Sequence, residues 1–325
     1  MDIKKFYSIC LQGSVTEAIE YLDTIEDNSS ELLELRAEYK ERFYNPDYIH
    51  EIDSDDSWVR SVLYEYITYF RSVLTGISAL EAEKELITGL TGLLTCKSNN
   101  LDEIEDELKK RFVEKGYSFL GGITPPYRGP YIWKTTSRKE FSVILPEDEQ
   151  KMTVYFVSDF LMLSWAHFAT LGERHTGGWA AADGLYYVNN SDREIDTESV
   201  NFQVWFLKHE AQHLSDYRKY PGLKPVNLEY RAKLIELIYN PDSVSLMEKF
   251  INEAKNDVTL PHSFAAYSII KGLSPVLFNE EYINTAGRWK SIRTKDISEA
   301  ALKLFSINTE KLNNTVNYNE YPYII

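Results

Sequence analysis

The spacing of apolar residues changes near Gly116, and this change limits the fold more than any other feature of the sequence. Before Gly116, segments such as VTEAIEYLDTI and SWVRSVLYEYITYFRSVLTGI place apolar residues three and four positions apart, which is the helical period. After it, FSVILP and MTVYFVSDF are apolar, β-branched runs bounded by turn residues, which are typical of β-strands, and helical patterns then return. The sequence therefore predicts an α+β fold, with an all-α N-terminal domain over residues 1–116 and a domain of strands followed by helices over residues 117–325.

Charge is distributed unevenly between these domains. The chain of 325 residues has a formal net charge of −15, and residues 1–112 alone carry 24 acidic against 12 basic side chains. A negative surface repels nucleic acid and anionic lipid headgroups, so neither is expected as a partner. A peptide or protein is expected instead, and a partner protein on the acidic helices should be basic or neutral.

Targeting signals are not apparent in the sequence. The N-terminal segment MDIKKFYSICLQGSVTEA lacks the apolar run of a signal peptide, and no stretch approaches the ~18 apolar residues of a membrane span. We therefore expect a cytoplasmic protein without membrane contact.

The strongest chemical signal lies in IDTESVNFQVWFLKHEAQHLSDYRKYPG, residues 195–222. Asp196 or Thr197 can cap a helix there, and the apolar residues that follow recur on one face. Inside this predicted helix is HEAQH, in which His209 and His213 are four residues apart. Side chains at i and i+4 lie one above the other, so both imidazoles can reach a single metal ion.

Glu210 directly follows the first of these histidines. Its carboxylate can take a proton from a water molecule that the metal activates. Random placement of 6 histidines and 32 glutamates in 325 residues gives roughly 0.01 expected matches to the pattern, so coincidence explains it poorly. The alternative is a surface pair of histidines or a hydrogen-bonded feature of the core.

A catalytic zinc site has three protein ligands and one open position, so a third ligand must follow the motif. Asp216 is too close on the same helix to reach the ion, and it is expected either to accept a hydrogen bond from a ligand imidazole or to be solvated. The next predicted helix, PVNLEYRAKLIELIY, places Glu229 and Glu236 seven residues apart on one face. Both are candidates for the third ligand.

These residues resemble the gluzincin branch of the HExxH zinc metallopeptidases, or zincins. In that family the third ligand is a glutamate on the helix after the motif helix, within an ExxA-like sequence, and residues 229–232, EYRA, match it. The resemblance implies one zinc ion bound by His209, His213 and Glu229, with Glu236 as the fallback ligand or as a residue that positions a ligand. It also implies a zincin-like catalytic domain with a small mixed or antiparallel sheet.

The activity that the resemblance implies is hydrolysis of peptide bonds, with Glu210 as the general base. Zincins place an edge strand before the motif helix, and WAAADGLYYVNN, with Leu185 to Val188 as strand, occupies that position. The sequence lacks the GxMEN motif of one aminopeptidase branch, which favours an endopeptidase. The alternatives are a non-peptide zinc hydrolase and a zinc-binding regulatory protein without turnover, and Glu210 favours catalysis over the latter.

Peptide hydrolysis also needs a hydrogen-bond donor for the tetrahedral oxyanion. The candidate donors in this sequence are His175, Arg231, His262 and Tyr267. His262 and Tyr267, in PHSFAAYSII, are preferred because such donors often follow the ligand helix in this family. Of the other histidines, His167 is expected in a core or on a helix surface, and His50 is expected in solvent.

Overall fold

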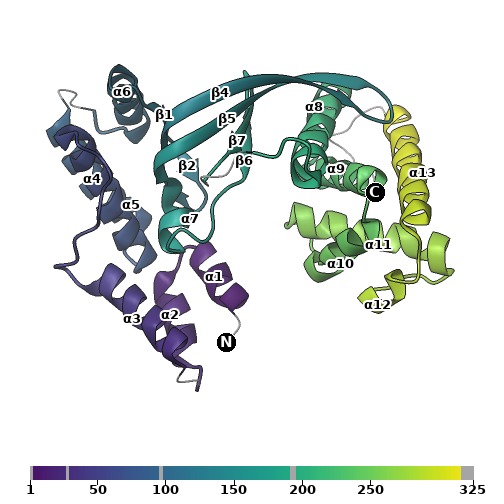
Figure 1. Ribbon diagram of the computed structural model, residues 1–325, viewed down its shortest axis with the longest axis horizontal. Helices are drawn as coiled ribbons and strands as arrows, with labels where there is room; N and C mark the ends of the chain where they lie inside the picture. Colours follow the sequence, from purple (N-terminus) through teal and green to yellow (C-terminus); the bar gives the residue numbers. More distant parts are fainter. Residues whose placement is uncertain (1–2, 27–28, 95–97, 191–194, 316–325) are drawn as a thin grey trace. The chain divides into compact units, whose positions relative to one another are not determined.

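The structure is a computed structural model that describes residues 3–26, 29–94, 98–190 and 195–315 (Figure 1). Helices precede and follow a five-stranded sheet, which confirms the predicted α+β class. Helix α6, the last of the N-terminal series, ends at Glu114, and Gly116 follows it with a φ of 82°, which glycine adopts at low steric cost. Within the four described ranges, no helix is long and apolar enough to cross a membrane.

The chain divides into two compact units of three segments each. The first unit consists of Met1–Ser137, Phe156–Trp179 and Tyr186–Asp192, and the second consists of Arg138–Tyr155, Ala180–Leu185 and Arg193–Ile325. The predicted boundary at Gly116 therefore marks the end of the helical series, whereas the compact units divide within the long strands that follow. The first unit thus contains strands as well as the predicted all-α region.

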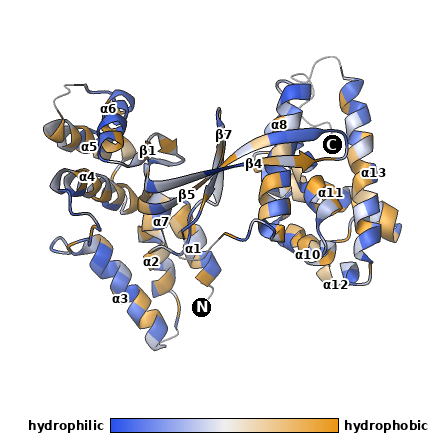
Figure 2. Ribbon diagram, turned by 45° about the horizontal axis from the view of Figure 1, so that its top comes forward, coloured by the Kyte–Doolittle hydropathy of each residue, from blue (hydrophilic) through white to orange (hydrophobic). Residues whose placement is uncertain are grey.

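The first unit is built on helices whose apolar faces meet in one core. Its helices are α1 (Ile3–Leu11), α2 (Val15–Asp23), α3 (Ser30–Tyr44), α4 (Ser57–Leu74), α5 (Ala79–Leu93), α6 (Leu101–Glu114) and α7 (Ser164–Ala169). Figure 2 shows hydrophilic and hydrophobic residues side by side along α3 and α4, as expected for helices that bury one face. Aromatic rings pack around Phe168, whose ring lies 5.3 Å from Phe43 and 5.7 Å from Phe70. The expectation that His50 is solvated is wrong, because its ring is buried 5.2 Å from Phe168.

Two long strands, β4 (Tyr131–Ile144) and β5 (Glu149–Leu163), are neighbours in the sheet and contribute to both units. The other strands are β1 (Ser118–Leu120), β2 (Ile123–Thr124), β3 (Tyr127–Arg128), β6 (Gly178–Ala181) and β7 (Gly184–Val188). The five-stranded sheet has the order β1-β4-β5-β7-β6, with β1 antiparallel to β4, and β2 and β3 form a separate pair. Leu185 to Val188 form a strand as predicted, but β6 lies at the edge, because β7 is hydrogen-bonded between β5 and β6.

The second unit is organised around helix α9 (Pro225–Tyr239). Its other helical elements are η1 (Asn201–Lys208), α8 (His209–Lys219), α10 (Ser243–Glu253), α11 (Pro261–Phe278), α12 (Ala286–Trp289) and α13 (Thr294–Asn313). Proline suits the first turn of α9, where a backbone N–H has no partner in the helix. Residues on all sides of α9 are buried, and α8, α11 and α13 pack against it. Polar side chains on such a helix need partners inside the protein.

Arg231 of α9 finds these partners on two neighbouring helices. Its guanidinium group is fully buried and donates to Asp216 of α8, and to Asn308 and Thr309 of α13, each at 2.9 Å. Asp216 also accepts a hydrogen bond from Gln212 at 2.8 Å. Because these bonds join three helices, they set the rotation of α9 against the motif helix.

Candidate metal centre

The predicted motif helix is present, but it consists of a π-helical part followed by an α-helical part. Residues 201–208 form the π-helix η1, in which the His209 N–H donates to the carbonyl oxygen of Val204, and residues 209–219 form α8. The expected cap at Asp196 or Thr197 is wrong, because the N-cap position falls at Val200, and the Asp196 carboxylate instead accepts a hydrogen bond from the Glu198 N–H, at 3.0 Å, in the turn before the helix. π-helical turns are rare and frequently occur at functional sites. Because the α-helical winding begins at the first motif histidine, the two histidines keep the one-turn spacing that places their side chains together.

His209, His213 and Glu229 converge on one point of the second unit. The Nε2 atoms of the two histidines are 3.0 Å apart, and carboxylate oxygens of Glu229 lie 3.6 Å from His209 Nε2 and 3.5 Å from His213 Nε2. Bonds of ~2.1 Å at tetrahedral angles would separate two zinc ligands by roughly 3.4 Å, so these distances are close to the edges of such a site. Two imidazoles and a carboxylate are also a donor set that zinc accepts. The three side chains could therefore hold a metal ion.

One carboxylate oxygen at this point lacks a hydrogen bond. Oε2 of Glu229 is buried and accepts no hydrogen bond of good geometry within the described part of the chain, although His262 Nδ1 lies 2.8 Å away. A buried carboxylate oxygen without a donor is unfavourable, and a bound cation removes that cost. His262 already offsets part of this cost, so the fit to zinc rests on the donor set and on its spacing.

The charges at the site are balanced between carboxylates and imidazoles. Burial acts to raise the pKa of Glu229, but the contacts with His213 and His262 outweigh burial and hold its pKa well below the usual range. Burial acts to lower the pKa of His213, yet Glu229, Glu210 and Asp216 together raise it. The contact with Glu229 also raises the pKa of His262 against a smaller effect of burial. The buried carboxylate therefore stays ionised, which a metal ligand requires.

Glu236 contacts a candidate ligand rather than the point of convergence. Its Oε1 lies 2.6 Å from Nδ1 of His209, the ring nitrogen on the far side from Nε2, and both side chains are nearly buried. Metal-binding histidines usually donate their second N–H to a carboxylate or carbonyl, which sets the tautomer and the ring orientation. This geometry favours the positioning role for Glu236 over the role of third ligand. Asp216 has neither of its expected roles, because it is fully buried and accepts hydrogen bonds from Gln212 and Arg231.

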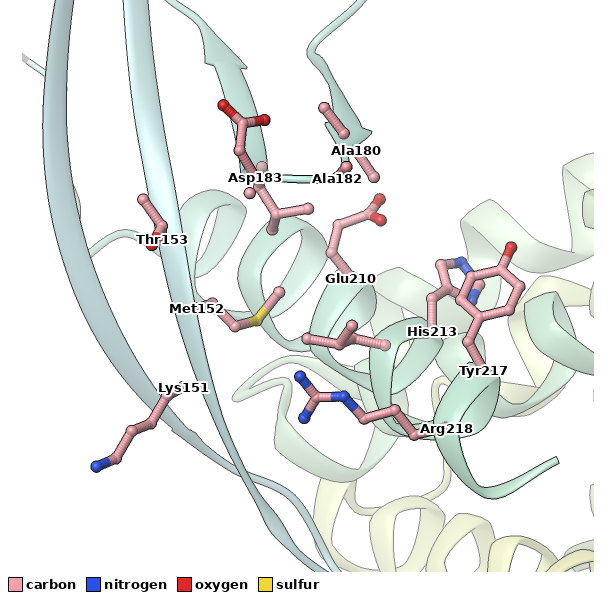
Figure 3. A pocket seen from close by; sticks show the side chains of 14 residues that line it. Lys151, Met152, Thr153, Ala180, Ala182, Asp183, Glu210, His213, Tyr217 and Arg218 are labelled. Carbon is pink, nitrogen blue, oxygen red and sulfur yellow. The ribbon is translucent and has the colours of Figure 1, made fainter. Parts of the chain in front are cut away.

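Glu210 lines a cavity of about 330 Å³ next to the second motif histidine. In Figure 3 its carboxylate points into this cavity, toward the turn between β6 and β7 where Ala182 and Asp183 lie. His213 and Tyr217 line the same cavity from α8. The other side chains around it come from β5, from the β6–β7 hairpin and from α8: Lys151, Met152, Thr153, Ala180, Ala181, Leu185, Leu214 and Arg218. The structure thus places a carboxylate that can act as a base at an open space that one candidate ligand, His213, also lines.

The four candidate oxyanion donors lie in different surroundings. His262, in the first turn of α11, is the one in contact with Glu229, and 63% of its side chain is exposed. Tyr267 lies further along α11, where its ring is 5.2 Å from Tyr282 and lines a separate cavity of about 360 Å³. Arg231 is fully buried in its network, and His175 belongs to the first unit. The structure therefore places His262 beside the candidate metal ligands.

Sequence reasoning missed two features of the site. Tyr217 follows His213 by four residues, so the two side chains share a face of α8, and both line the cavity with Glu210. Tyr217 is 59% exposed. Its four-residue spacing from His213 was the signal in the sequence that could have identified it. The turn between β4 and β5 also contacts the end of α8, where the Ser215 hydroxyl donates to Asp148 at 2.7 Å. No pattern in the sequence pointed to this contact between distant segments.

Comparison with family models, curated proteins and solved structures found no match for this chain. Any conclusion about function therefore depends on the residues of the site and their geometry.

Proposed function

We propose that this chain is a zinc-dependent hydrolase, and within that class a zincin-type endopeptidase of the gluzincin branch. The observation that supports the proposal is the placement of Glu210 relative to the candidate ligands. Helix α8 presents His209 and His213 to Glu229, and it directs Glu210 into the adjoining cavity. A protein that only stored or sensed a metal would not need a carboxylate at this position.

In this proposal Glu210 acts as the general base. A zinc ion held by His209, His213 and Glu229 would lower the pKa of a coordinated water to ~7 and polarise the carbonyl group of the substrate. Glu210 accepts the proton of the attacking water and later delivers it to the leaving amine. His262 is the proposed donor to the developing oxyanion, because it is exposed and lies 2.8 Å from Glu229.

The edge of the sheet favours a peptide over a compact non-peptide substrate. As an edge strand, β6 has one side that no other strand of the sheet covers, and an extended peptide can pair with such a side. Ala180, Ala181 and Ala182 line the cavity here, and their small side chains leave room for a substrate backbone. Internal cleavage is favoured because the sequence lacks the GxMEN motif.

In this proposal the acidic first unit also contacts a polypeptide. Helix α3 exposes four glutamates that are spaced at three and four residues and so follow one face: Glu31, Glu34, Glu38 and Glu41. Such a face suits a basic or neutral polypeptide, and salt should weaken the contact.

The test combines metal analysis with hydrolysis of a peptide library. Zinc-loaded wild type is expected to hold one zinc ion per chain and to cleave internal peptide bonds, and chelation should abolish cleavage. Glu210→Gln should retain zinc but lose activity by about 10²- to 10⁴-fold, because it cannot accept the proton. Glu299→Gln, which changes an exposed glutamate of α13, is the matched control and should behave as wild type.

Each alternative gives a different result in this test. Stoichiometric zinc without cleavage of any peptide would contradict the peptidase assignment, and cleavage of ester or other non-peptide substrates would then indicate a different zinc hydrolase. Equal activity of Glu210→Gln and wild type would contradict the assignment of the base. Failure to bind zinc after loading would refute the metal site itself.

A further inference from the structure

The cavity that Glu210 lines has a basic residue at its other end. Along α8, Glu210, Leu214 and Arg218 are four positions apart, so they follow one face of the helix, and all three line the cavity. The helix rises about 12 Å from residue 210 to residue 218, and helical side chains lean back toward the N-terminus. The Arg218 side chain therefore extends over part of the distance to Glu210. In Figure 3 its guanidinium group points from α8 toward β5.

Arg218 has donors that a ligand can reach. The residue is exposed, and its Nη1 donates to the neutral amide oxygen of Gln150 on β5 at 2.8 Å. It forms no ion pair with a carboxylate of the described chain, whereas its neighbour Lys219 pairs with Asp148 at 2.9 Å. A guanidinium group has five N–H donors, so the bond to Gln150 leaves others for a ligand. The positive charge of Arg218 is thus available inside the cavity.

The other charged residues of the lining lie away from Arg218. Glu210 is two turns earlier on α8, and Asp183 belongs to the turn between β6 and β7. Figure 3 shows Asp183 on the opposite side of the cavity from Arg218. Lys151 of β5 also lines the cavity, but its ammonium group points away from Arg218 in the same view. Arg218 therefore sets the charge at its end of a cavity whose lining is mostly apolar.

We propose that this end of the cavity binds an acidic side chain of the substrate, close to the bond that is cleaved, and that it prefers glutamate to aspartate. The inference rests on the proposed peptidase function and names the substrate class. A side chain that enters beside Glu210 lies along Leu214, and its carboxylate accepts charge-assisted hydrogen bonds from Arg218. Glutamate has one methylene group more than aspartate, so its carboxylate reaches further from the peptide backbone. Three apolar side chains of the lining contact the methylene groups: Met152, Leu185 and Leu214.

Peptide binding to zinc-loaded Glu210→Gln protein tests the inference without turnover. The probes are fluorescein-labelled short peptides of neutral sequence, in which glutamate, aspartate or glutamine occupies each position in turn. Measured by fluorescence anisotropy, at least one glutamate peptide should bind about three- to tenfold more tightly than its glutamine counterpart, as expected for an ion pair that the ligand partly covers. The matching aspartate peptide should lie between the two. High salt should reduce the difference.

Substitutions of Arg218 in the same background test the role of its charge. Arg218→Gln should abolish the preference for glutamate, and Arg218→Lys should retain part of it. Arg218→Glu should reverse the charge preference, so that a peptide with lysine at the same position binds more tightly than the glutamate peptide. Arg293→Gln is the matched control, because Arg293 is an arginine of the second unit that is 79% exposed and does not line the cavity. It should keep the preference unchanged.

Binding and cleavage together separate this inference from the proposed function. Wild-type cleavage of a peptide library with glutamate no more frequent than glutamine near the cleaved bonds would overturn the inference and leave the peptidase function intact. Equal binding of glutamate and glutamine peptides, no binding of any peptide, or an unchanged preference in folded Arg218→Gln would also overturn it. Glutamate-dependent binding that Arg218→Gln abolishes, without cleavage of any peptide by wild type, would support the acidic ligand and contradict the peptidase function.

Discussion

Replacement of Glu236 by alanine tests how the candidate metal centre is held together. The Glu236 carboxylate lies 2.6 Å from His209 Nδ1, and the side chains of the two residues are only 7% and 11% exposed. A buried hydrogen bond to a charged group contributes about 1.5–3 kcal/mol. At 1.4 kcal/mol per factor of ten, the loss corresponds to a decrease in zinc affinity of about 10- to 100-fold, which is also the usual effect of removing such a partner.

The assay is a competition titration of zinc against a chelator of known affinity. Glu236→Ala should bind one zinc ion with this reduced affinity, whereas Glu229→Ala, which removes a proposed ligand, should lose far more. Glu236→Gln should lie between Glu236→Ala and wild type, because its amide oxygen still accepts the imidazole N–H. Glu299→Gln, on the exposed face of α13, is the control and should match wild type.

Two results would refute this reasoning. Wild-type affinity in Glu236→Ala would show that the contact with His209 does not position the ring for metal binding. Complete loss of zinc in Glu236→Ala, together with little change in Glu229→Ala, would show that Glu236 is the third ligand. The second result would also exchange the roles that the distances assign to the two glutamates.

Three further predictions concern stability, measured as the free energy of unfolding in urea. Asp216→Asn should lower it by about 3 kcal/mol, because the guanidinium group of Arg231 keeps its buried charge without the neutralising carboxylate. The pKa of His50 is lowered from 6.5 to about 4 by burial and nearby cations. Its contribution to stability is therefore complete above pH 6.5 and is lost as the pH falls to about 4. His50→Gln should flatten the pH dependence of stability in this window. Gly184→Ala should lower the free energy of unfolding by about 1–3 kcal/mol, because Gly184 has a φ of 153° and an added Cβ would lie 2.6 Å from a carbonyl oxygen of β5. Gly177→Ala is the control and should leave stability unchanged, because a Cβ added there meets no atom within 4 Å.

A different result would contradict each of these three predictions. An Asp216→Asn protein as stable as wild type would show that Glu147, 3.9 Å from Arg231, compensates the charge. Unchanged pH dependence in His50→Gln would assign the effect to His167, whose pKa is lowered to about 4 in the same direction. Equal stability of the two glycine variants would show that β7 can shift away from β5 without cost.

Local periodicity was enough to predict the elements of the site. The four-residue spacing of His209 and His213 needs only an α-helix, and α8 begins at His209. The same reasoning placed Glu229 and Glu236 on one face of the next helix, and both contact the motif helix there. The strand at Leu185 to Val188 also followed from its apolar and aromatic residues.

Tertiary contacts decided what the sequence left open. Whether Glu229 or Glu236 faces Nε2 of the histidines depends on the rotation of α9, which the buried bonds of Arg231 to neighbouring helices set. The π-helical winding of residues 201–208 changes the positions of side chains without a clear change in apolar spacing, so the periodicity predicted a single α-helix. His50 looked solvated among polar neighbours in the sequence, but its ring packs against Phe168, which is more than one hundred positions away.

An anomalous diffraction map of zinc-loaded protein at the zinc absorption edge tests the proposed metal centre most directly. The prediction is one strong peak within bonding distance of His209 Nε2, His213 Nε2 and a carboxylate oxygen of Glu229, with Glu210 near the ion but not a ligand. A peak elsewhere, a peak with Glu236 in place of Glu229, or no peak after loading with zinc would contradict it.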